Sequence, residues 1–182
     1  MKESKEFYWA EAASGFIDYV NFYYDLVGTR IFNLHFRYWA EALNKFQQIN
    51  ESNFKVEELL IILNFLCQSL ETLAGVSIKP RKRTPQLLTM YKKSLKDEMG
   101  WDMPKERPDL FKNLKDMSKY HNNLCKHINR SDSRKELLSQ ISYKKIRKYM
   151  ATTKEIWLWI LNKKFNGEIP ANQLVLFEFD FY

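Results

Sequence analysis

Helix-breaking residues are scarce in this chain, and that scarcity limits its fold more than any other feature of the sequence. The 182 residues include only five glycines and five prolines. Sheet sandwiches and barrels need turn residues at many short connections, whereas a few long helices need little glycine or proline. Apolar residues also recur at helical spacing along most of the chain. We therefore expect an all-α protein, a helical bundle of five to six helices, in a single domain over residues 1–182.

The helical pattern occurs in six long stretches, each bounded by polar or turn residues. These stretches cover approximately residues 5–27, 29–49, 54–74, 84–99, 108–128 and 142–165. We expect Gly75 and Gly100 to end two of the helices, since glycine is common just after a helix. Residues 101–107 are expected to form a loop, and Ser133 with Glu136 indicates the capping box of a further short helix.

The stretch 54–74 is apolar almost all round, which predicts the central helix of the bundle. Its polar exceptions, Asn64, Gln68 and Glu71, fall on one line of the helix. A polar line on a buried helix needs hydrogen-bond partners, water or a cleft. The line is therefore either part of an internal hydrogen-bond network or part of a site.

The C-terminal arm, residues 168–182, is the one segment with a strand pattern. Phe177, Phe179 and Phe181 alternate there with acidic residues, which predicts a strand over 174–181. A lone strand in a helical domain either packs as an extended arm or pairs with another chain.

Positive charge is concentrated in the middle of the chain. Residues 1–75 have a net charge of −4, residues 76–167 carry 23 basic and 9 acidic groups for a net of +14, and residues 168–182 have a net of −3. Such a field favours nucleic acid or another phosphate-rich partner, although a solvated lysine-rich surface gives the same count. Four of the bases lie together around Pro80, namely Lys79, Arg81, Lys82 and Arg83.

Several function classes are disfavoured by the composition. The longest apolar run, Leu59 to Cys67, is too short to span a bilayer, which needs about 20 residues. The N-terminal segment carries acids where a signal peptide needs an apolar core, so we expect a cytoplasmic protein without a membrane anchor. Three histidines and two cysteines without metal-ligand spacing indicate no metal and no cofactor.

The stretch 108–128 contains an apolar seam with one histidine in it. Its members recur at alternating intervals of four and three residues: Leu110, Leu114, Met117, His121, Leu124 and Ile128. His121 is therefore expected to face other parts of the protein or an interface. His127 lies six residues further on and is turned about 120° from His121 on a regular helix. A lone histidine at either position is most often structural, but the pair lies within a segment, YHNNLCKH, that is rich in polar side chains.

That segment resembles the motif of the HEPN superfamily, helical domains of prokaryotic toxins, phage-defence proteins and CRISPR-associated RNases. The family motif is an Arg, usually followed by Asn, with a His four to six residues after the Arg. Here His121 stands at the Arg position, Asn122 follows it, and His127 lies at the matching distance. The likeness extends over about residues 56–161, including the helix–loop–helix order of LNFLCQSLETLAG and TPQLLTMYKKSL.

The resemblance implies a metal-independent endoribonuclease of a toxin–antitoxin or phage-defence system. In such an enzyme His127 would move the proton, and His121 with Asn122 would hold the phosphate. The family also implies a homodimer, with an antitoxin or other protein as a further partner. The nucleic-acid-binding residues expected beside this site are Lys79, Arg81, Lys82, Arg83 and Lys126.

Two other functions remain open on the sequence. The chain is either this RNA-directed protein or a non-catalytic helical module that binds a protein or nucleic acid. A third alternative is a regulatory protein whose basic face binds DNA, although no helix-turn-helix spacing is evident.

Overall fold

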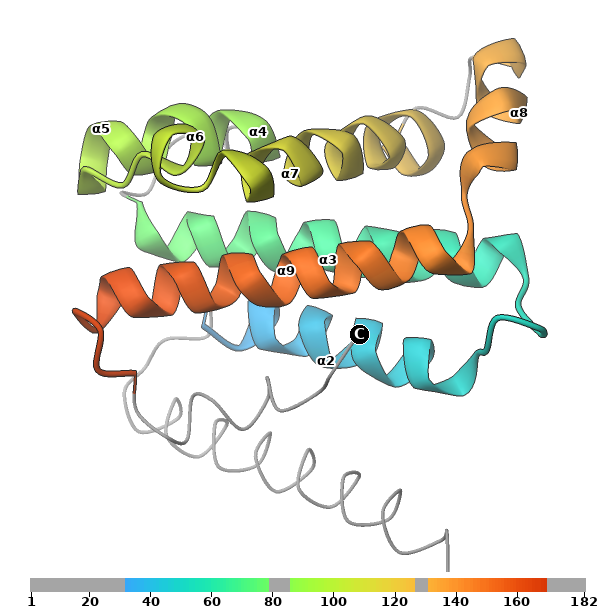
Figure 1. Ribbon diagram of the computed structural model, residues 1–182, viewed down its shortest axis with the longest axis horizontal. Helices are drawn as coiled ribbons and strands as arrows, with labels where there is room; N and C mark the ends of the chain where they lie inside the picture. The colour runs from blue at the N-terminus through green and yellow to red at the C-terminus, as the bar shows by residue number, and fades with distance from the viewer. Residues whose placement is uncertain (1–31, 79–85, 127–130, 170–182) are drawn as a thin grey trace, which may run out of the picture.

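The expected all-α architecture is confirmed. A computed structural model describes residues 32–78, 86–126 and 131–169, and within these ranges the chain is helical apart from short connections and forms no strand (Figure 1). The helix predicted at residues 5–27 and the strand predicted at 174–181 lie outside the described residues.

Four long helices make up the frame of the bundle. They are α2 (Phe32–Gln48), α3 (Val56–Ser77), α7 (Pro108–His121) and α9 (Tyr143–Lys164). Helix α3 packs against the other three, and Figure 1 shows it running between α2 on one side and α7 on the other, with α9 beside it. This position agrees with the central role predicted for the stretch 54–74.

Two of the predicted helices contain π-helical turns. The first is one continuous helical run made of α4 (Leu87–Thr89), the π-helical segment η1 (Met90–Ser94) and α5 (Leu95–Met99). The second is α7 followed by the π-helical segment η2 (Asn122–Lys126). Such turns are rare and occur often at functional sites, and η2 begins directly after His121.

Two short helices complete the order of elements. Helix α6 (Met103–Glu106) lies in the region predicted to be a loop, so that prediction is wrong. The carboxylate of Asp102 accepts a hydrogen bond from the backbone N–H of Lys105 at 3.4 Å, which caps the first turn of α6. Helix α8 (Ser131–Gln140) begins two residues before the expected capping serine and stands at a steep angle to α9 in Figure 1.

The two glycines predicted to end helices behave differently. Helix α3 continues through Gly75 to Ser77, so the predicted end at Gly75 is wrong. Glycine in a helix costs only some conformational entropy, and burial of the adjacent Leu73 and Ala74 offsets that cost. Gly100 does end its helix, with a φ of 73° that favours glycine over any residue with a side chain.

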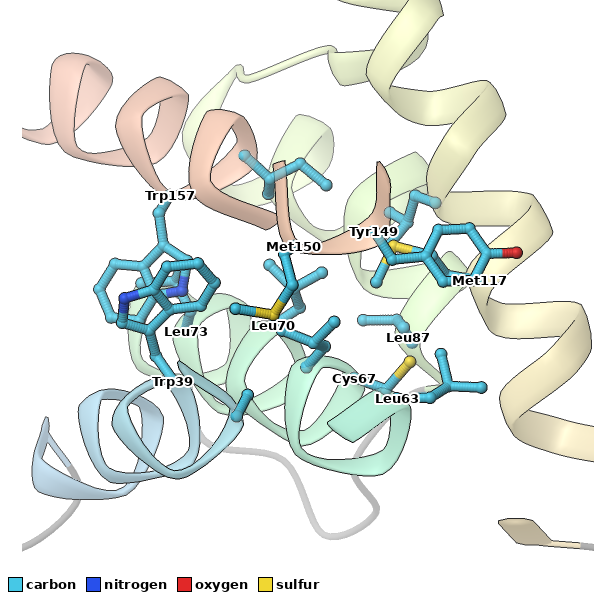
Figure 2. Packing of buried hydrophobic residues seen from close by; sticks show 14 of the residues in the cluster. Trp39, Leu63, Cys67, Leu70, Leu73, Leu87, Met117, Tyr149, Met150 and Trp157 are labelled. Carbon is cyan, nitrogen blue, oxygen red and sulfur yellow. The ribbon is translucent and has the colours of Figure 1, made fainter. Parts of the chain in front are cut away.

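The core extends through the bundle, and one part of it lies where α2, α3 and α9 meet. Trp39 on α2 and Trp157 on α9 are both fully buried and point into the same region of Figure 2. The indole N–H of Trp157 donates to the hydroxyl of Ser69 at 3.0 Å, and that hydroxyl donates to the backbone carbonyl of His35 at 3.0 Å. This chain of two hydrogen bonds joins all three helices and satisfies polar groups that burial would otherwise penalise.

Helix α3 has the composition of a core helix. Of the helices that the structure describes, it is the one long and apolar enough to cross a membrane by length and composition, and helices at the centre of a globular fold meet the same criterion. Its packing against α2, α7 and α9 accounts for that composition within this fold.

Candidate nucleic-acid interface

The apolar seam predicted around His121 is present in α7 and η2. Its five described members are at most 4% exposed: Leu110, Leu114, Met117, His121 and Leu124. The prediction that His121 faces the protein is therefore confirmed.

His121 is tied to the central helix by a hydrogen bond. Its imidazole is 1% exposed, and Nε2 lies 3.0 Å from the side-chain oxygen Oδ1 of Asn64 on α3. An amide oxygen only accepts, so the hydrogen in this contact is on Nε2 of the imidazole. Asn64 is thus part of an internal hydrogen-bond network. This is one of the two roles that the sequence left open for the polar line of α3, the other being part of a site. In this conformation Nε2 of His121 is already bonded inside the protein.

Asn122 does not join His121 in a common polar site. Its side-chain amide lies 3.4 Å from the hydroxyl of Ser118, one turn back on α7. The next residue, Asn123, donates to the backbone carbonyl of Lys119 at 2.7 Å. Both contacts reach back by four residues along the same helical run. A π-helical turn leaves backbone carbonyls of the preceding turn, such as that of Lys119, free to accept a side-chain donor.

The other residues predicted for the site are not placed by the structure. Lys126 is the last residue of η2, and its side chain is outside the described part. The remaining predicted residues also fall outside the described ranges: Lys79, Arg81, Lys82, Arg83 and His127, together with the last seam residue Ile128.

The described part of the chain does have a basic surface, on α7 and α9. We call it the lysine face and define it by six residues: Lys112, Lys115, Lys119, Lys144, Lys145 and Lys148. All are exposed except Lys145, which is half-buried. The spacing of the first three keeps them within one narrow sector of α7, and Lys144 and Lys148 are one turn apart on α9.

The lysine face is one surface because contacts between Tyr120 and Lys145 bring its two rows together. Nζ of Lys145 donates to the hydroxyl of Tyr120 at 2.6 Å and lies 3.8 Å from the centre of its ring. The same hydroxyl donates to the side-chain oxygen of Gln140 at 2.5 Å. Lys145 is therefore held between the α7 row and the α9 row, in contact with a ring whose face attracts cations.

A second contact between α7 and α9 joins Tyr149 to Asp116. The Tyr149 hydroxyl donates to the carboxylate of Asp116 at 2.6 Å. Burial raises the pKa of Tyr149 far above its ordinary value, and the hydrogen bond to Asp116 and its negative charge raise it further. The phenol therefore stays protonated and continues to donate to Asp116.

Helices α7 and α9 run antiparallel, so the start of α7 lies beside the second half of α9, where several charges are paired. At the start of α7, Arg107 contacts Asp109 at 3.2 Å and Glu155 of α9 at 3.6 Å. Near the same end, Lys163 contacts Glu106 at 2.6 Å. No ion pair joins the six lysines of the lysine face to an acid within the described residues. Within the described residues, the positive charge of the lysine face is therefore not neutralised by ion pairs.

Sequence reasoning found the excess of charge in the middle of the chain but assigned it to the loop around Pro80. The lysines of α7 and those of α9 each show a helical stripe in the sequence, which was the available signal. That the two stripes meet depends on the packing of helices more than twenty residues apart along the chain.

The described residues contain no group of three His, Cys, Asp or Glu side chains that could hold a metal ion. No family model, curated protein or solved structure matches this chain.

Proposed function

We propose that this protein is a helical nucleic-acid-binding module whose contact surface is the lysine face. RNA is the polyanion that the resemblance to HEPN domains implies. The observation that carries the proposal is that two rows of lysines, on α7 and α9, meet on one surface without an acidic partner among the described residues. Lysine ammonium groups bind phosphates as point charges, so such a surface suits a phosphate backbone.

The position of His121 supports binding as the function over cleavage. An imidazole that is 1% exposed and bonded to Asn64 cannot meet a phosphate unless α7 or η2 moves away from α3. A hydrogen-bonded histidine within an apolar seam also has a complete structural explanation.

Metal-independent RNA cleavage in a toxin–antitoxin or phage-defence setting is the second candidate function. The observation in its favour is η2, a π-helical segment that begins directly after His121 and ends at Lys126. In this candidate, His127 transfers the proton and His121 with Asn122 holds the phosphate, in a homodimer as the family resemblance implies. His127→Ala would then abolish cleavage of a labelled RNA without added metal, and a variant that still cleaves would exclude this site.

Binding itself is tested by the salt dependence of affinity. Each phosphate contact of a B-form duplex contributes about −0.9 to the slope of log K against log salt concentration. We expect the double variant Lys119→Gln/Lys144→Gln, which removes one charge from each row, to bind more weakly and to have a slope smaller in magnitude by about two. Fluorescence anisotropy with a labelled RNA hairpin at several salt concentrations measures both quantities.

The matched control is the double variant Arg37→Gln/Lys105→Gln, which removes two exposed charges from α2 and α6. Its net charge equals that of the first variant, so a general effect of charge would change the affinity and the salt slope of both variants alike. Equal affinities and slopes for the two variants, or no binding by the wild type at low salt, would rule out the lysine face as the site.

A further inference from the structure

The shape of the lysine face carries information about which form of nucleic acid fits it. The cations form two rows rather than one track. Lys112 and Lys119 are separated by about 10 Å along α7, at 1.5 Å per residue. The α9 row runs beside it, because packed helices lie about 8–10 Å apart. The lysine face is thus roughly as wide as it is long.

A surface of that width matches phosphates on two strands. The phosphate rows of a duplex face each other across grooves about 6 Å and 12 Å wide in B-form DNA. Double-stranded RNA is likewise recognised by shape and by backbone contacts across its minor groove. A single strand presents one line of phosphates, which one row of lysines would follow.

The aromatic rings near the lysine face are not available to stack on bases. Tyr120 and Phe111 of α7 are 2% and 7% exposed, and Tyr149 of α9 is fully buried. Tyr143, next to Lys144, is half-buried, and its ring stacks on Phe46. Every other aromatic side chain whose exposure the structure describes is buried or half-buried. Proteins that hold single strands combine a basic groove with aromatic rings on which successive bases stack. The lysine face has the charge of such a site without the rings.

Lys145 adds a preformed contact at the centre of the face. Its ammonium is held by the Tyr120 hydroxyl and ring, which leaves two of its three N–H groups for other acceptors. A cation already held in place loses less side-chain entropy when it binds a phosphate.

We infer that the lysine face binds double-stranded nucleic acid along its phosphate backbone, with no preference for base sequence. The inference rests on the proposed function and names the form of its ligand. Lys145 acts as the fixed contact between the two strands, and the exposed lysines of each row contact the phosphates of one strand.

The test measures the affinity of the full chain for four labelled probes of equal length at one low salt concentration. The probes are a double-stranded RNA, a double-stranded DNA, and a single strand of each. We expect both duplexes to bind at least ten times more tightly than either single strand, and two unrelated duplex sequences to differ by less than threefold. The Lys119→Gln/Lys144→Gln variant should lose this preference, whereas Arg37→Gln/Lys105→Gln should keep it.

Each other result has a definite meaning. Single strands that bind as tightly as duplexes, with binding still lost in Lys119→Gln/Lys144→Gln, would overturn the inference and leave the proposed function in place. A preference of tenfold or more for one duplex sequence would also overturn the inference. Absence of binding to all four probes, or duplex binding that Lys119→Gln/Lys144→Gln does not change, would overturn both. A stronger affinity for double-stranded RNA than for double-stranded DNA supports the inference and assigns the A-form helix as the ligand.

Discussion

The contact between His121 and Asn64 is expected to stabilise the fold, because each residue satisfies a polar group of the other. Truncation to alanine leaves the partner's group without its bond, which costs about 1–3 kcal/mol when that group is buried. We expect His121→Ala and Asn64→Ala each to lower the free energy of unfolding by that amount. The double variant should lose less than the sum, since the two changes remove one shared contact. Urea denaturation of the wild type, the two single variants and the double variant measures the coupling free energy between the two residues.

Asn123→Ala is the matched control at this scale, because within the described residues its side chain bonds to the carbonyl of Lys119 on its own helix. It should change the stability by no more than about 0.5 kcal/mol. A His121→Ala variant as stable as the wild type would show that the imidazole is free for another role, and would favour the cleavage function.

The buried tyrosines give the stability a dependence on alkaline pH. Burial raises the pKa of Tyr91 and Tyr149, and nearby acids, Glu71 for the first and Asp116 for the second, raise it further. Unfolding exposes phenols that lose their protons near pH 10, while the folded protein keeps them. Stability is therefore independent of these groups below about pH 10 and falls above it, by up to about 1.4 kcal/mol per pH unit for each tyrosine.

Tyr149→Phe tests this dependence, since phenylalanine has no proton to lose. Its free energy of unfolding should be lower than that of the wild type at pH 8, where the hydrogen bond to Asp116 is missing. The free energy of unfolding of Tyr149→Phe should then decline less steeply than that of the wild type between pH 10 and 11. Parallel curves for the two proteins, from urea denaturation at each pH, would contradict the assigned effect of Tyr149.

At the scale of the element, we expect the same substitution to have opposite effects on stability at Gly75 and at Gly100. Gly75 lies inside α3, and a Cβ added there meets nothing within 4 Å. Gly75→Ala should therefore raise the free energy of unfolding by about 0.5–1 kcal/mol. Gly100 has a φ of 73°, so Gly100→Ala should lower the free energy by about 1–2 kcal/mol.

Each glycine serves as the control for the other, because both variants add the same methyl group. Thermal or urea denaturation distinguishes them by sign. If Gly75→Ala destabilises the protein as much as Gly100→Ala does, then α3 ends at Gly75, as the sequence pattern predicted.

At the scale of the whole molecule, the contacts of α3 with α2, α7 and α9 predict cooperative unfolding. Removing any one of these helices exposes a face of α3 that is buried in the core. We expect far-ultraviolet circular dichroism, which follows helix content, to show a single transition with urea. Tryptophan fluorescence should give the same midpoint, because Trp39 and Trp157 lie on different helices of one core.

Two separate midpoints would instead show that α7 and its neighbours unfold apart from the α2–α3–α9 core. That outcome would also bear on binding, because the lysine face depends on α7 and α9 staying packed against each other.

The helices and the buried sides of α3 and α7 were predictable because local periodicity determines them. An apolar residue every three or four positions specifies a buried stripe wherever the helix packs. This is why the seam through His121 was identified correctly although nothing in the sequence showed its partner. The same local information failed at Gly75 and at residues 101–107, where packing and a cap at Asp102 extended or formed a helix.

By itself, the sequence determined that the chain is helical, that its central helix is apolar, and that its positive charge lies in the middle. Only the tertiary structure decided that His121 bonds to Asn64, 57 residues away, and that the lysines of α7 and α9 form one surface. The physical reason is that periodicity is a property of neighbouring residues, whereas these contacts depend on how helices pack. The antiparallel packing of α7 against α9 brings Tyr120 to Lys145, and no spacing along the chain specifies that distance.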